Sequence, residues 1–180
     1  MKTKKIETLN DLFLEELGGL YNAENQLIEA LPRITEAINS QELRTIIEDQ
    51  LEKTKMQANR LKVIFKELKT EPDHVVCKGM MGLIQEGQQL VRKSAKCPAR
   101  DAAIIGTAQT VEHYEIAGYG TAKSHASMLG HHRIQELLNE TLKEKKEADE
   151  SLNELAEDSI NLKAQKENED FDEIIEREIL

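Results

Sequence analysis

Apolar residues recur every three or four positions through almost the whole chain, which is the spacing of one face of an α-helix. The first helix is expected to begin near Thr8 or Asn10 and to end at Asn39. Its repeating positions are Phe13, Leu17, Leu20, Glu24, Leu27, Leu31, Ile34 and Ile38. Pro32 lies inside this pattern, where the loss of one backbone donor is expected to kink the helix. A chain with this periodicity is expected to fold from long amphipathic helices.

Four further segments show the same spacing, at about 41–69, 79–95 and 98–129, and from about 131 onward. The segment at 79–95 is short, and each of the others is long enough to span a bundle. Pro98 suits the first turn of a helix, and Gly130 suits the stop that follows one. Four long helices and one short connecting helix indicate an all-α fold, a four-helix bundle with a crossover. No linker divides the pattern, so one domain is expected over 1–165.

Composition excludes two classes of protein. Aromatic residues make up only 3% of the 180 residues, and tryptophan is absent. A β-sandwich needs many aromatic and β-branched strand residues, so this fold is not expected. The formal net charge is −10, from 34 acidic and 24 basic side chains. Nucleic-acid binding depends on Lys and Arg at phosphates, so no nucleic-acid partner is expected.

The sequence also indicates a cytoplasmic protein without a membrane partner. The uncharged stretch AAIIGTAQTV is too short to cross a bilayer, and no apolar run follows the N-terminal lysines as it would in a secretory signal. Cys77 and Cys97 flank the short helix, whose ends are expected to lie about 20–25 Å apart. A disulfide between them is therefore not expected, which fits a reducing compartment.

The C-terminal segment 166–180 differs from the rest of the chain. Between Lys166 and Glu178 it has seven acidic and two basic side chains, yet Phe171, Ile174, Ile175 and Ile179 repeat at helical spacing. Charge runs of this kind are usually solvated tails. The alternative is a short helix that docks on a partner subunit.

Several glutamates occupy positions where the helical pattern calls for apolar residues. Glu24 falls within the stripe of the first helix, and Glu112 and Glu115 replace two successive interior positions of the fourth. Glu144 lies about 60° from the centre of the stripe of the fifth helix. Buried carboxylates need protons, cationic partners or metal ions. In helical bundles a pair of iron or manganese ions is the usual solution. The alternative is that these glutamates are solvated.

The sequence resembles the YciE/YciF stress proteins, a ferritin-like family, over about residues 8–160. The matching segments are LYNAENQL at 20–27, ALP at 30–32, QLEKT at 50–54, GLI at 82–84, RDAA at 100–103, VEHYEIA at 111–117 and ETL at 140–142. The run at 112–117 is specific to this family, and the remaining segments support the resemblance because they follow in the order expected of the family. The resemblance implies a ferritin-like bundle that forms a homodimer. It also implies a two-metal site of iron or manganese held by Glu24, Glu112, Glu115 and Glu144.

The chain departs from the family pattern at three positions. Family members read His-Leu-Glu-Glu-Thr where this chain has QLEKT, so Gln50 replaces an imidazole ligand and Lys53 replaces a carboxylate. Lys145 likewise stands where relatives carry glutamate. Glu52 is retained, but it points about 140–160° away from the apolar stripe of its helix. Each lost ligand and each added positive charge disfavours a metal ion at this place.

Three functions are consistent with these residues. In the first, the glutamates still bind metal in a degenerate site, and the protein oxidises the metal or handles peroxide or dioxygen weakly. In the second, Lys53 and Lys145 replace the ions, leaving a metal-free, non-catalytic dimer that acts as a structural or interaction protein in stress. In the third, the bundle binds a small apolar ligand between its helices. Whether the protein is an enzyme stays open, and no catalytic residue is assigned.

Overall fold

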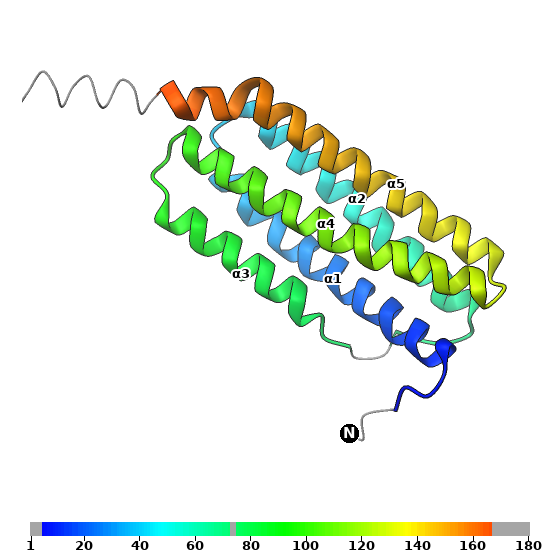
Figure 1. Cartoon of the computed structure of the whole chain (residues 1–180). Coiled ribbons are helices and arrows are strands. Elements are labelled where there is room, and N and C mark those ends of the chain that lie inside the picture. The colour runs from blue at the N-terminus through cyan, green and yellow to red at the C-terminus, as the bar shows by residue number, and fades with distance from the viewer. Residues whose placement is uncertain (1–4, 73–74, 167–180) are drawn as a thin grey trace, which may run out of the picture.

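The computed structural model describes residues 5–72 and 75–166, and these residues form a helical bundle (Figure 1). The helices are α1 (Leu9–Ala37), α2 (Gln41–Glu67), α3 (Lys78–Lys93), α4 (Pro98–Met128) and α5 (His132–Leu155). A π-helical turn, η1 (Ala156–Ile160), continues α5. The described residues contain no strand, and the predicted all-α fold with four long helices and one short helix is confirmed.

The helix boundaries follow from local hydrogen bonds. Thr8 caps α1, because its hydroxyl accepts from the Asp11 N–H at 3.1 Å and the Asp11 carboxylate accepts from the Thr8 N–H at 3.1 Å. Pro32 lies inside α1, and the helix continues through it to Ala37. Gly130 follows α4 with a φ of +76°, a left-handed conformation that glycine adopts without a Cβ penalty.

A buried carboxylate from α4 closes the turn between α1 and α2. Asp101 is 2% exposed, and it accepts hydrogen bonds from the backbone N–H groups of Asn39 at 2.9 Å and Ser40 at 2.8 Å. These N–H groups lie in the turn just before α2, where no helical carbonyl is available to them. Asp101 therefore ties the beginning of α4 to the α1–α2 turn.

The short helix α3 makes the crossover. α1 and α2 pack as one helical pair, and α4 and α5 pack as another, with α4 also in contact with α1. α3 runs along the outside of the bundle against α1 and α4 (Figure 1), and it returns the chain to the end where α4 begins. This is the four-helix bundle with one crossover that the helix lengths predict.

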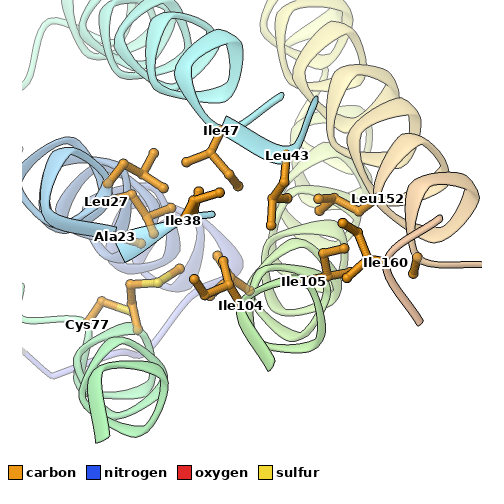
Figure 2. Close-up of a cluster of buried hydrophobic side chains, with 14 residues drawn as sticks. Ala23, Leu27, Ile38, Leu43, Ile47, Cys77, Ile104, Ile105, Leu152 and Ile160 are labelled. Carbon is orange, nitrogen blue, oxygen red and sulfur yellow. The ribbon is translucent and has the colours of Figure 1, made fainter. Parts of the chain in front are cut away.

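Two separate clusters of apolar side chains form the core. The first apolar cluster lies toward the α1–α2 turn (Figure 2) and contains Ala23, Leu27, Leu31, Ile38, Leu43, Ile47, Cys77, Met80, Ile104, Ile105, Val111, Leu152, Ala156 and Ile160. The second apolar cluster occupies the opposite end and contains Phe13, Leu17, Leu20, Leu61, Ile64, Phe65, Tyr119, Ala122, Ala126, Ile134, Leu138 and Leu142. A layer of buried polar residues separates the two.

Some sequence-based expectations concern features outside the core. Among the described residues, no helix is long and apolar enough to cross a membrane. Cys77 and Cys97 are free thiols, as their spacing predicts. The acidic tail or docking helix expected over 166–180 lies outside the described residues, except for Lys166.

Candidate functional site

The polar layer is a set of buried polar side chains between the two apolar clusters. Each bundle helix contributes to it where its apolar stripe is interrupted. The members are Glu24 of α1, Gln50, Thr54 and Gln57 of α2, Glu112 and Glu115 of α4, and Thr141 and Lys145 of α5. Their burial in the middle of the bundle makes this layer the candidate functional site.

Lys145 is the cation at the centre of the polar layer. It is 0% exposed, and its Nζ lies 2.6 Å from Glu115 Oε2 and 3.5 Å from Glu24 Oε1. Burial acts to lower the pKa of Lys145, but the carboxylates of Glu115, Glu24 and Glu112 outweigh it and raise the pKa above its ordinary value. The ammonium group is therefore charged and held between α1 and α4.

Glu24 has a second partner in Tyr119. The tyrosine hydroxyl donates to Glu24 Oε1 at 2.6 Å, and both side chains are 0% exposed. Burial and the neighbouring Glu24 raise the pKa of Tyr119 well above its usual value, so its hydroxyl keeps its proton. Burial and the nearby Glu115 also raise the pKa of Glu24 to about 8, against the opposing charge of Lys145.

Glu112 has an amide partner instead of a cation. The Gln50 side-chain N–H donates to Glu112 Oε1, and among the described residues no ion pair to Glu112 is formed. Burial raises the pKa of Glu112 to about 7, although the charge of Lys145 opposes this shift. Glu112 Oε2 is buried without a hydrogen-bond partner, as are Glu24 Oε2 and Glu115 Oε1.

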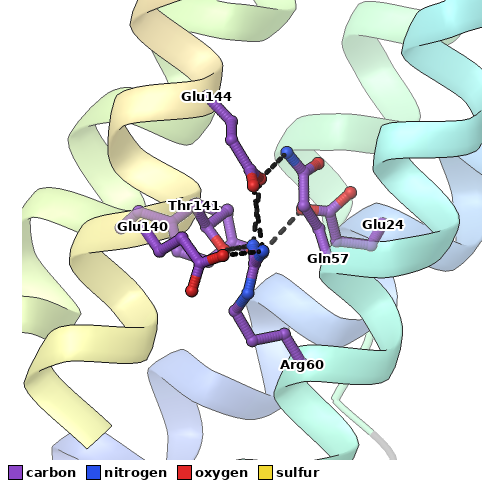
Figure 3. A network of polar contacts seen from close by, with 7 residues as sticks. Glu24, Gln57, Arg60, Glu140, Thr141 and Glu144 are labelled. Carbon is purple, nitrogen blue, oxygen red and sulfur yellow. Dashed lines mark hydrogen bonds and ion pairs between the residues drawn. The ribbon is translucent and has the colours of Figure 1, made fainter.

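Glu144 belongs to a second network at the edge of the bundle (Figure 3). Arg60 of α2 donates to both carboxylate oxygens of Glu144 at 2.9 Å, and it also reaches Glu140 at 2.9 Å and Thr141 at 2.6 Å. Gln57 donates to Glu144 at 2.9 Å. Partial burial acts to raise the pKa of Glu144, but the hydrogen bonds from Arg60 and Gln57 lower it below its ordinary value.

The structure brings together three of the four predicted metal ligands. Glu24, Glu112 and Glu115 converge on the polar layer, whereas Glu144 turns toward Arg60. Of the two lysines expected among the carboxylates, Lys145 is there, but Lys53 is only half-buried and forms no ion pair among the described residues. Glu52 is exposed and pairs with Lys55, in agreement with its predicted outward direction.

The residues of the polar layer do not fit a two-metal centre. The ammonium group of Lys145 lies within ion-pair distance of two of the three carboxylates. Helix α2 contributes amides and a hydroxyl, whereas a metal site needs carboxylates or imidazoles. In 5–72 and 75–166, no three Asp, Glu, His or Cys side chains are arranged to hold one metal ion. Lys145 supplies the positive charge that the buried carboxylates require.

Three contributors to the site were missed in the sequence. Tyr119 is four residues after Glu115, so its place on the same face of α4 was available from the spacing alone. Tyr21, which is three residues before Glu24, instead packs edge-on against Phe65 with ring centroids 6.1 Å apart. Arg60 and Gln57 carried no signal in the sequence, because polar residues outside the apolar stripe of a helix are common. In the structure Gln57 is nevertheless buried.

Comparisons with known proteins identify relatives along most of the chain. A family profile described as a domain of unknown function, DUF892, matches residues 8–165. Protein YciF of Escherichia coli (strain K12) is 38% identical over 161 residues, which cover 89% of this chain and 97% of YciF.

Solved structures of relatives share the helical arrangement. The crystal structure of the E. coli stress protein YciF matches with a TM-score of 0.83 at 37% identity, covering 87% of this chain and 99% of that one. YcfI from Rhodopseudomonas palustris, for which a structural role has been suggested, matches with a TM-score of 0.80 at 39% identity, covering 85% and 98%. A protein of Xanthomonas campestris at 17% identity, with a TM-score of 0.70, shares the fold.

Proposed function

The chain belongs to the DUF892 family with YciF, and from this premise we propose that it is a metal-free structural protein in which Lys145 replaces a metal ion. The main support for this proposal is the position of Lys145 Nζ, which lies 2.6 Å from Glu115 Oε2 and 3.5 Å from Glu24 Oε1. All three side chains are fully buried. A fixed internal cation neutralises carboxylates that would otherwise need bound metal.

The departures on α2 support the same proposal. Gln50 donates an amide hydrogen bond to Glu112, which satisfies one carboxylate oxygen without any metal. Gln57 donates to Glu144 and so joins the Arg60 network rather than leaving a carboxylate free for an ion. In both cases an amide of α2 forms a hydrogen bond with a carboxylate of another helix, and this bond takes the place of a bond between that carboxylate and a metal ion.

In this proposal the polar layer specifies how the helices align. Lys145 of α5 meets Glu24 of α1 and Glu115 of α4 only in the present register. A slip of one helix by a turn, about 5.4 Å, would leave the ammonium group among apolar residues of either cluster. Buried polar groups can therefore fix a unique packing, a role that suits a structural protein.

Elemental analysis tests this proposal. Tag-free protein is reconstituted with Fe²⁺ or Mn²⁺ and desalted, alongside the variant Lys145→Gln and the control Lys146→Gln, whose lysine is exposed. We expect near-zero metal in the wild type and in the control. In Lys145→Gln, we expect up to one ion per chain, because three carboxylates lose their cation. One or two ions retained by the wild type would overturn the proposal.

Metal binding in a degenerate site is the second candidate function. Its support is that Glu24 Oε2, Glu112 Oε2 and Glu115 Oε1 are buried without partners. In this alternative the three glutamates hold iron or manganese despite Lys145, and the protein shows weak metal oxidation or peroxide handling. The same elemental analysis separates the two candidates, since metal in the wild type favours the second.

The proposal includes a role in stress in the cytoplasm as a ferritin-like homodimer. YciF is described as a stress protein, and the free thiols of Cys77 and Cys97 are consistent with a reducing compartment. Light scattering tests the oligomeric state. We expect the mass of two chains, and a monomer or a 24-subunit particle would contradict the dimer.

A further inference from the structure

A groove on the outside of the bundle, the α3–α4 groove, lies between the crossover helix and the first half of α4. Its walls include Leu83, Glu86 and Leu90 of α3 and Ala103 and Thr107 of α4, and Glu86 is the one charged residue among those that line it. The groove holds about 360 Å³, whereas a water molecule needs about 10–15 Å³ by this kind of measure. Leu90 is 43% exposed. The groove therefore presents apolar surface to solvent and has room for several side chains.

Four positive side chains lie at one end of this groove, where α3 ends and α4 begins. They are Arg92, Lys93, Lys96 and Arg100, and none of them forms an ion pair within the described part of the chain. Arg100 donates to the Ser94 carbonyl at 2.5 Å, which places its side chain between the two helices, and its Nε is buried without a partner. Lys96 and Arg100 lie near the N-terminus of α4, where the helix dipole disfavours positive charge. A carboxylate beside these cations would be favourable.

The C-terminal segment beyond Lys166 has the opposite charge and begins at the same end of the bundle. Ile160 of η1 belongs to the same apolar cluster as Ile104 of α4, so the last described residues lie near the beginning of α4 (Figure 1). Residues 167–173 contain five acidic side chains and no basic one. The match to the family profile ends at residue 165, so this segment lies outside the family match. Its charge is complementary to that of the four cations.

We propose that residues 167–180 dock in the α3–α4 groove of their own chain. Phe171, Ile174 and Ile175, which repeat at helical spacing, then lie against the apolar walls, and the acidic side chains of 167–173 lie beside the four cations. The segment is covalently joined to the same bundle, and the resulting high effective concentration favours its own groove over that of another molecule. This interaction goes beyond the proposed structural role and depends on none of the contacts in the polar layer.

The length of the segment allows this path. A helix is about 10–12 Å wide with its side chains, and four extended residues span about 13–14 Å. Residues 167–170 can therefore cross the beginning of α4 and bring Phe171 to the groove. A segment that enters beside the cations and continues along α3 also brings Arg177 toward Glu86, the one carboxylate of the groove. In the reverse direction the acidic residues would meet Glu86 instead.

Carbodiimide cross-linking of the full chain, read by mass spectrometry, tests the proposal. Unlabelled and ¹⁵N-labelled protein are unfolded, mixed in equal amounts and refolded together, so that links between chains are recognised by their mixed label. We expect amide links from Lys93 or Lys96 to acidic residues of the C-terminal segment, each within one chain, and links from the neighbouring Lys163 show that the reagent reaches the segment. Mixed-label links to Lys93 or Lys96 would place the segment on a second copy, and links to Lys163 alone would show that the groove is not its site. Either result would overturn the proposal.

Three variants locate the docking site. Ile174→Asp removes an apolar side chain from the segment, and we expect it to lower the yield of the Lys93 and Lys96 links about tenfold. Leu90→Glu places a negative charge in the groove and is expected to lower the yield by about the same factor. Met81→Glu changes another exposed apolar residue of α3, outside the groove, and should leave the yield unchanged. An unchanged yield in Ile174→Asp or Leu90→Glu would refute this site, with a cooperative thermal transition as the check on folding.

Discussion

The bundle contains two cation–carboxylate networks that differ in their access to water. Lys145 lies fully buried between Glu24 and Glu115, whereas the Arg60 side chain is 14% exposed and its partners Glu144 and Glu140 are 21% and 58% exposed. Water can solvate Arg60 or its partners if a pair breaks, but it does not reach Lys145. The comparison shows that burial, more than contact distance, determines how strongly the fold depends on a charged pair.

The largest effect is expected from removing the buried cation. Lys145→Met keeps the length of the side chain but leaves the buried carboxylates of Glu24 and Glu115 without a positive charge. We expect the free energy of unfolding to fall by about 3–5 kcal/mol, measured by urea denaturation. Lys146→Met, at the adjacent exposed position, is the control and should change it by less than about 0.5 kcal/mol. A loss below about 1 kcal/mol in Lys145→Met would show that the buried pair adds little to stability.

The second largest effect is expected in the pH dependence of the free energy of unfolding, which should also differ between the buried and the partly exposed network. The folded-state pKa values of Glu24 and Glu112 are raised to about 8 and about 7 by burial, above the ordinary value of 4.5. The folded state therefore binds more protons than the unfolded state near neutrality, so stability falls as pH rises through these values. The fall begins above the ordinary value of 4.5 and levels off above about pH 8, and between pH 5 and 8 we expect a slope of up to about 1.4 kcal/mol per pH unit for each proton.

Urea denaturation at a series of pH values measures this slope. Glu112→Gln removes one of the two groups, and it should reduce the slope between pH 5 and 7 while leaving the fall near pH 8, which Glu24 causes. A wild-type stability that rises with pH over this range would contradict the raised pKa values. Glu144 acts in the opposite direction, because its lowered pKa adds stability that is lost only as pH falls below 4.5.

The smallest effect is expected at the edge of the bundle. Arg60→Met removes the paired hydrogen bonds to Glu144, and we expect a loss of about 1–2 kcal/mol because water replaces part of the interaction. Lys55→Met breaks the exposed pair with Glu52 and should cost less than about 0.5 kcal/mol. The expected losses in the free energy of unfolding decrease from Lys145 to Arg60 to Lys55, in the order of decreasing burial. If thermal or urea denaturation gave Arg60→Met the larger loss than Lys145→Met, the comparison between the two networks would be wrong.

The fold and part of the site could be predicted from the sequence. Helical spacing, Pro98 and Gly130 gave helix boundaries that agree closely with α1 to α5, because local hydrogen bonding and apolar periodicity set these ends. Glu24, Glu112 and Glu115 were predicted to face inward for the same reason, and they are buried. The directions of the Glu144 and Lys53 side chains were harder to predict, since both residues lie near the margin of the apolar face of their helix. At such a position a small rotation of the helix decides whether the side chain faces solvent or the core.

The sequence by itself therefore determined an all-α bundle with carboxylates inside it, because helical periodicity depends on neighbours along the chain. Only the tertiary structure decided which cation meets those carboxylates. Lys145 and Lys53 are alike as residues, but packing of α5 against α1 and α4 places Lys145 between Glu24 and Glu115 and leaves Lys53 at the margin. The pairing joins residues that are 30 and 121 positions apart, and such contacts depend on how the helices pack rather than on any one helix.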